Sequence, residues 1–288
     1  TDATPANIRA GLPVVSIQTG AHKYDEARKR LDDVRPISPN NLQARYLIAL
    51  IDFQEKKTVA ARDAALQILK FAPEHLPTLV LTGAAESALG AHTQAQAHLG
   101  TVLERAPRYL LARKLLALSL TKSGDFKRAL DVIQPGLNQA PKDPLLLAMA
   151  ADAHLKLQNF SAAVEYFEKA AVLDPNNALL RTGLGISRLG VGQVARAFNE
   201  LESAVQMDTT GYQADVVLVY SHLQRRNYDE ALRASQSLEQ KQPKNPVTHN
   251  LKGLIYTGQK DFQSARKSFG QALTLQPRFL PAATNLAL

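Results

Sequence analysis

The sequence predicts an all-α fold of stacked helix–turn–helix units, because two series of residues recur with a period of 34 residues. The first series is proline, which occupies eight of nine successive frame positions and is replaced only at Thr209. These prolines are Pro5, Pro39, Pro73, Pro107, Pro141, Pro175, Pro243 and Pro277. The second series lies twelve residues earlier and is alanine throughout: Ala27, Ala61, Ala95, Ala129, Ala163, Ala197, Ala231 and Ala265. Such a period is the signature of a solenoid, in which each unit buries its apolar face against its neighbours.

The frame divides the chain into eight helix pairs and the beginning of a ninth. The expected repeats are 8–41, 42–75, 76–109, 110–143, 144–177, 178–211, 212–245 and 246–279, in a single solenoid over residues 1–288. Residues 280–288 are expected to form a partial capping helix, which we interpret as the first helix of a ninth repeat, cut short in an excised fragment of a longer protein. The frame alanines predict close helix crossings, where a larger side chain would hold the backbones apart.

The repeat over 144–177 illustrates how each element is assigned. Pro144 is expected to open the first helix, where the missing N–H of proline costs nothing. In the second helix Phe160, Ala163 and Phe167 fall on one helical face. Pro175 then ends that helix, because the residue before a proline is disfavoured in the helical region. The other repeats are interpreted in the same way.

Two repeats depart from this pattern. The first carries Pro13 within its first helix, with Gly11 and Gly20 on either side, so that helix is expected to be kinked or partial. The sixth ends without a proline, and the next helix has Val219 where a smaller residue is usual. We therefore expect a hinge near residues 208–212; a locally adjusted but rigid turn is the alternative.

The sequence carries no arrangement of residues that indicates catalysis. It has no cysteine, and its seven histidines are scattered without metal-ligand spacing. The glycine-rich segment 183–190 does not match the dinucleotide-binding pattern, and we interpret Gly185 and Gly190 as structural residues of the repeat. No enzyme activity, cofactor or metal site is expected.

Charge and hydropathy argue against two further classes of partner. The net charge is +8, but charges of both signs are spread along the chain and no basic stripe is interleaved with aromatic residues. This pattern does not favour nucleic-acid binding. No apolar run approaches the roughly 18 residues that span a bilayer, so this chain is not expected to insert into a membrane.

The recurring residues resemble the tetratricopeptide repeat. That family has a small residue in the first helix, an aromatic residue opening the second, an alanine, and an ending of the Asp-Pro-Asn-Asn type. Asp174–Asn177 matches this ending and Ser38–Asn41 nearly does, and the resemblance covers about residues 8–279. It implies a right-handed superhelical solenoid of about eight helix–turn–helix units, with the first helices lining the concave side.

The resemblance also implies which residues face the concave groove. They are Tyr46, Leu50, Phe53, Val80, Lys114, Leu118, Asp152, Leu155, Ile186, Leu189, Tyr220, Leu223 and Leu254. This face is largely apolar, which indicates a protein or peptide ligand; the alternative is that adjacent helices cover much of it. A carboxylate clamp and an asparagine ladder, both used by members of the family, are not expected, because residues such as Leu50 and Leu81 occupy the comparable positions.

The last repeats also resemble the long tetratricopeptide lipoproteins of bacterial exopolysaccharide and PEP-CTERM sorting systems. The resemblance lies in the segments 250–256, 261–269 and 277–287. It implies a non-catalytic interaction scaffold, held in the periplasm or at the cell envelope through a missing N-terminal segment. A cytoplasmic location is the alternative, as is a regulatory or targeting module of a larger protein with a catalytic domain elsewhere. The sequence leaves the oligomeric state open.

Overall fold

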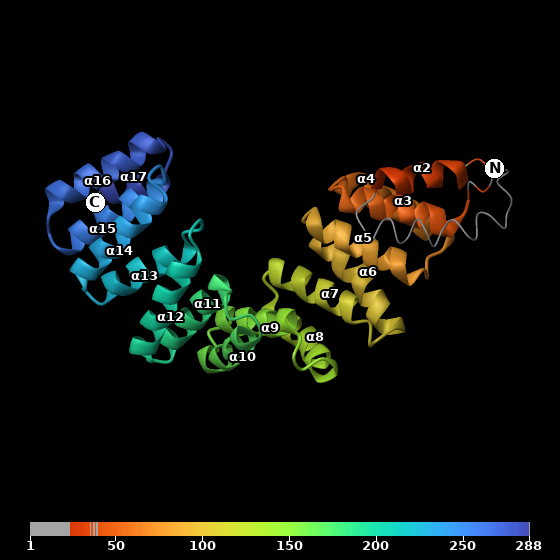
Figure 1. Ribbon diagram of the computed structural model, residues 1–288, viewed down its shortest axis with the longest axis horizontal. Coiled ribbons are helices and arrows are strands. Elements are labelled where there is room, and N and C mark those ends of the chain that lie inside the picture. Colours follow the sequence, from red (N-terminus) through yellow and green to blue (C-terminus); the bar gives the residue numbers. More distant parts are fainter. Residues whose placement is uncertain (1–23, 35, 37, 39, 288) are drawn as a thin grey trace. The chain divides into compact units, whose positions relative to one another are not determined.

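The computed structural model of this protein describes residues 24–287 except 35, 37 and 39, and over this range it is all-α, with sixteen helices and no strand. The chain forms two compact units, Thr1–Pro141 (unit 1) and Lys142–Leu288 (unit 2). Figure 1 shows the helices following one another in sequence order within each unit. The expected kink at Pro13 lies outside the described residues. The single continuous solenoid stays a prediction.

Both units are built from helix pairs whose bounds follow the predicted frame. Unit 1 contains α2 (Tyr24–Val34), α3 (Leu42–Gln54), α4 (Thr58–Phe71), α5 (Leu76–Ala88), α6 (His92–Arg105), α7 (Leu110–Lys122) and α8 (Phe126–Gln139). Unit 2 contains α9 (Pro144–Lys156), α10 (Phe160–Leu173), α11 (Ala178–Gly190), α12 (Val194–Met207), α13 (Gln213–Gln224), α14 (Tyr228–Lys241), α15 (Pro246–Gly258), α16 (Phe262–Leu275) and α17 (Leu280–Ala287). The odd-numbered helices are the first helices of their repeats, and the even-numbered ones are the second helices.

The frame residues mark the ends of the second helices. Each of these helices begins at the position where the repeat has an aromatic residue or its substitute, from Tyr24 to Phe262. Each second helix from α4 to α16 ends two residues before the frame position of its repeat, which is proline except at Thr209. Pro144 lies in the first turn of α9, where Asp143 caps the helix by accepting the amide hydrogen of Leu146. The tight turn between the helices of each pair places one residue at positive φ, as at Gly124 and Gly192.

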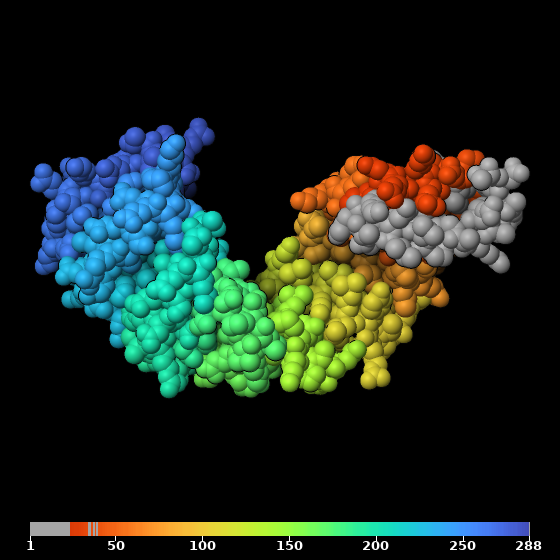
Figure 2. All heavy atoms as spheres, viewed as in Figure 1, coloured from red at the N-terminus to blue at the C-terminus, as the bar shows by residue number. Residues whose placement is uncertain are grey.

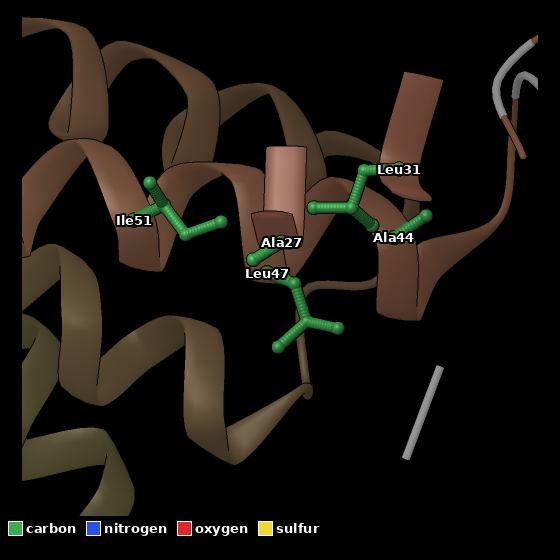
Figure 3. Close-up of a cluster of buried hydrophobic side chains, with 5 residues drawn as sticks. All are labelled: Ala27, Leu31, Ala44, Leu47 and Ile51. Atoms are coloured by element: carbon green, nitrogen blue, oxygen red, sulfur yellow. The ribbon is translucent and has the colours of Figure 1, made fainter. Parts of the chain in front are cut away.

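Small residues allow the helices to cross closely, as predicted. All eight frame alanines are buried, seven of them completely. A side-chain carbon at Gly185 would lie 2.7 Å from Leu201, and one at Gly190 would lie 2.3 Å from Phe160, so both glycines are structural. Figure 3 shows the first of these contacts, where Ala27 and Leu31 of α2 pack against α3.

The first helices form the inner layer of each unit. In unit 1, α3 contacts α5 and α5 contacts α7; in unit 2, α9, α11, α13, α15 and α17 contact one another in succession. Among the described helices, no second helix contacts another second helix. The first helices therefore lie closer together than the second helices, which makes their face the concave one within each unit. Figure 2 shows the successive helix pairs of unit 2 stacked from green to blue without interleaving.

The turn at 208–212 lacks the frame proline but has several side-chain contacts. Asp208 accepts hydrogen bonds from the amides of Thr210 and Gly211. The Lys241 ammonium reaches Val205 O on one side of the turn and Asp215 on the other, at 3.2 and 2.7 Å. These contacts link α12, α13 and α14 at the turn. The hinge stays a prediction, with Lys241 as the residue that would resist its opening.

Candidate functional site

The concave face of unit 1 contains an apolar groove of about 380 Å³ between α3, α5 and α7. Its walls are formed by side chains at helical spacing on each of the three first helices. The lining residues are Tyr46, Leu50, Phe53, Pro77, Val80, Leu81, Ala84, Ser87, Ala88, Tyr109, Leu111, Leu115, Leu118 and Lys122. A groove of this volume and composition lies in the range of ligand sites, which are mostly apolar with a few polar groups.

The groove brings together five of the thirteen residues that the sequence predicts on the concave face. They are Tyr46, Leu50, Phe53, Val80 and Leu118. Their role as partner-binding residues stays a prediction. Lys114 is the remaining predicted residue in unit 1. It does not line the groove and is half-buried on α7.

The remaining seven predicted residues lie in unit 2 and share no described cavity. They are Asp152, Leu155, Ile186, Leu189, Tyr220, Leu223 and Leu254. Tyr220 is 41% exposed, whereas Leu223 packs against the core around Val219. Leu254 lines a separate cavity of about 370 Å³ with Phe262, Phe269 and other residues of α15, α16 and α17. The role of these seven residues in partner binding also stays a prediction.

Neighbouring helices cover part of the unit 1 groove. The sequence leaves such covering open as the alternative to an accessible binding face. Val80 is almost fully buried. Tyr46, Leu50 and Phe53 are half-buried against the core around Ala49 and Leu81. Leu118 remains 39% exposed and Leu111 51% exposed. The groove therefore keeps an accessible apolar surface on α7 over a floor that is already packed.

The concave-face spacing does not identify two aromatic residues near one end of the groove. Tyr109 lines the groove and His75 packs edge-on against Tyr46, with ring centroids 5.7 Å apart. Both occupy the N-cap position of a first helix, yet neither side chain caps its helix. The equivalent Asn41, Asp143 and Asn177 do. The sequence carried no specific signal for the role of Tyr109 in the groove, because Tyr212 is likewise an aromatic N-cap residue whose side chain does not cap its helix.

The polar atoms of the groove are few. Burial raises the pKa of the Tyr46 phenol, and the nearby Tyr109 raises it further, so the Tyr46 hydroxyl stays protonated and can donate a hydrogen bond at neutral pH. The Ser87 hydroxyl is buried and makes no hydrogen bond. The cationic Lys122 lies in the last turn of α7. The groove thus combines apolar walls with hydrogen-bond donors and one positive charge.

Other kinds of site were sought throughout the described residues. They contain no group of three or more His, Cys, Asp or Glu side chains that could hold a metal ion. None of the described helices is long and apolar enough to cross a membrane.

Models of the tetratricopeptide repeat match residues 87–153, 144–177 and 216–278, which together make up more than half of the chain. The chain belongs to the tetratricopeptide repeat family. Proteins of this fold are generally non-catalytic scaffolds.

This tetratricopeptide repeat chain has low sequence identity to the following known proteins. The CTR9 homolog of Arabidopsis thaliana is 23% identical over 285 residues, which make up 93% of this chain and 26% of that protein. The chain therefore spans about a quarter of the length of this relative. Many solved structures share the fold, including the following two. PilW, a type IV pilus biogenesis factor, matches 71% of this chain and 94% of its own with a TM-score of 0.63 and 17% identity. A tetratricopeptide repeat protein from Parabacteroides merdae matches 97% of both chains with a TM-score of 0.59 and 14% identity.

Proposed function

We propose that this protein is a non-catalytic interaction scaffold whose concave face binds peptide segments of partner proteins. The observation that carries this proposal is the groove of unit 1, in which Leu111 and Leu118 present apolar surface beside the half-buried Tyr46 and Phe53. Exposed apolar surface of this kind usually marks an interaction site. The corresponding face of unit 2, including Tyr220, is proposed as a second and shallower contact surface.

The groove favours a short peptide over a large flat partner. Its volume holds a few side chains, and its aromatic and large aliphatic walls suit the anchor residues that dominate peptide interfaces. Truncating such an anchor costs about 2 kcal/mol or more at the best positions, which is about thirtyfold in affinity.

Selection of a random peptide library on the immobilised full chain tests this proposal. The selected peptides are synthesised and their affinities measured by fluorescence anisotropy for the parent chain and for Tyr46→Ala and Leu118→Ala. Both substitutions should weaken binding by about tenfold or more. Leu89→Ala is the matched control, because Leu89 is 38% exposed in unit 1 and does not line the groove. Equal binding by the parent and both groove variants, with the fold intact, would mean that peptides use another surface.

A bacterial cell-envelope role in an exopolysaccharide or protein-sorting system is the finer form of this proposal. It is supported by the resemblance of segments 250–256, 261–269 and 277–287 to the envelope lipoproteins of those systems. The competing proposal is a regulatory or targeting module attached to a catalytic domain. The full-length gene separates the two: further repeats with a lipidation signal support the scaffold, and an enzymatic domain supports the module.

A further inference from the structure

We propose that the unit 1 groove selects acidic peptides, in which a bulky apolar anchor is flanked by Asp or Glu residues. This inference rests on the proposed peptide-binding function and adds the charge of the ligand. The side chains that line the groove include no carboxylate, and Lys122 is the charged residue among them. Their other polar groups are hydroxyls of Tyr46, Tyr109 and Ser87, all of which can donate hydrogen bonds.

The carboxylates of the neighbouring first helices are engaged elsewhere and do not offset Lys122. The Arg28 guanidinium donates to Asp52 and Glu55 of the α3 region at 2.7 and 2.5 Å. Arg28 also lowers the pKa of Glu55, so that carboxylate stays ionised and paired. Glu86 of α5 is buried and lies 2.8 Å from His98 on α6. Lys122 itself has no ion-pair partner among the described residues.

Ser87 gives an independent sign that the groove floor is built for a ligand. The equivalent residues of two other repeats, Thr121 and Thr257, donate their hydroxyl hydrogens to the carbonyls of Ala117 and Gly253 one turn earlier. The Ser87 hydroxyl makes no such bond, although the residue is 94% buried. A buried hydroxyl without a partner is costly, and a ligand carbonyl or carboxylate would satisfy it.

The beginning of α7 reinforces this preference. Tyr109 occupies its N-cap without accepting a hydrogen bond, so the first-turn N–H groups of α7 receive no side-chain cap. These groups carry the positive end of the helix dipole, which favours a negative group nearby. The lining residues extend from Tyr109 to Lys122, along the 13-residue α7. A helix of this length is roughly 20 Å long at 1.5 Å per residue, which is also the length of about six residues of extended peptide.

Three labelled octapeptides test the charge preference with the full chain. They share two leucines and one phenylalanine at the same positions, and their other residues are all glutamate, all serine or all lysine. The glutamate peptide should bind about tenfold more tightly than the serine peptide at low salt, and the lysine peptide least tightly. The preference should shrink as salt screens the charges.

Two variants locate the preference in the groove. Lys122→Glu should reverse the order of the glutamate and lysine peptides, and Ser87→Ala should weaken the glutamate peptide several-fold. Lys127→Glu is the matched control, because Lys127 is exposed on α8 outside the groove and carries the same charge change. Equal affinity for the glutamate and serine peptides, still sensitive to Leu118→Ala, overturns the acidic preference and leaves the groove function standing. A glutamate preference that persists in Lys122→Glu also overturns it. No binding of any peptide overturns both proposals.

Discussion

In unit 2 the first helices α9, α11 and α15 begin after Asp143, Asn177 and Asn245, whose side chains accept amide hydrogens of the first turn. Tyr212, at the N-cap of α13, accepts none. In unit 1, α5 and α7 begin after His75 and Tyr109, which accept none. An N-cap contributes about 1 kcal/mol, so unit 1 lacks this stabilisation at two described first helices, where only α3 has a cap, and unit 2 lacks it at α13. The side chains of Tyr109 and His75 instead add aromatic surface in the groove of unit 1 and beside it. The same position of the repeat therefore holds a stabilising N-cap in some repeats and contributes to a candidate binding surface in others.

Replacing a buried frame alanine by a larger residue should give the largest loss of stability, and the loss should be equal in the two units. Ala95 of unit 1 and Ala163 of unit 2 are both completely buried at the same repeat position. Ala95→Leu and Ala163→Leu should each cost about 1–3 kcal/mol, because the added atoms have no space between crossing helices. The free energy of unfolding in denaturant measures this cost.

The control for overpacking is Lys169→Leu, on the exposed side of α10. It removes an exposed ion pair with Glu165, and such solvent-exposed pairs contribute little to stability. If Ala163→Leu were no more destabilising than Lys169→Leu, the register assigned from prolines and alanines would be wrong. Hydrogen exchange should place the damage in the substituted repeat and its neighbours, as expected of a solenoid.

Exchange of N-caps between the units tests the comparison directly. Asp143→Ala should cost unit 2 about 1 kcal/mol, since the Leu146 amide then loses its acceptor. Tyr109→Asn should stabilise unit 1 by up to about the same amount and weaken peptide binding in the groove. Denaturation and anisotropy on the same variants measure both effects. Stronger peptide binding in Tyr109→Asn would contradict a role for the aromatic N-cap in the groove.

Acidification should destabilise unit 2 through two half-buried histidines, His154 and His222. His154 stacks on Tyr166 and His222 on Phe198, and neither Nδ1 atom has a hydrogen-bond partner. Burial lowers the pKa of both imidazoles below the ordinary 6.5, although Glu165 partly opposes this at His154. Because the unfolded chain binds protons more readily, their contribution to stability is full above pH 6.5 and is lost as the pH falls from 6.5 through the lower pKa of the folded state.

Hydrogen exchange at pH 8 and pH 5.5 measures this loss in the helices of unit 2. In the double variant His154→Phe, His222→Phe, protection of α9, α10, α12 and α13 should depend less on pH than in the parent. At the same repeat position unit 1 has Asp52 and Glu86, which are paired with Arg28 and His98. An unchanged pH dependence in the double variant would assign the acid sensitivity to other groups.

The fold was predictable from the sequence because its determinants recur. The alanines and the aromatic positions mark helix crossings and second-helix starts, and the predicted frame agrees with every described helix pair. The groove was predictable only in part. The resemblance to the tetratricopeptide repeat implied Tyr46, Leu50 and Leu118, but the contribution of Tyr109 depends on how the start of α7 approaches α3. That contact joins residues 63 positions apart, and no local pattern encodes it.

The smallest effect is expected at the turns between paired helices, where the units again differ. Each turn has one residue at positive φ: Lys56, Gly90 and Gly124 in unit 1, and Gln158, Gly192, Arg226 and Lys260 in unit 2. Left-handed backbone strains any residue with a Cβ atom, so unit 2 carries this strain at three of its four turns and unit 1 at one of its three described turns.

Gln158→Gly should therefore stabilise unit 2 by about 0.5–1 kcal/mol. Gly124→Ala should destabilise unit 1 by a similar amount, because a Cβ atom there meets no neighbour within 4 Å and only the backbone conformation is affected. Denaturant unfolding of the two variants measures both changes, and a loss of stability in Gln158→Gly would show that the greater freedom of glycine in the unfolded chain outweighs the relief of strain.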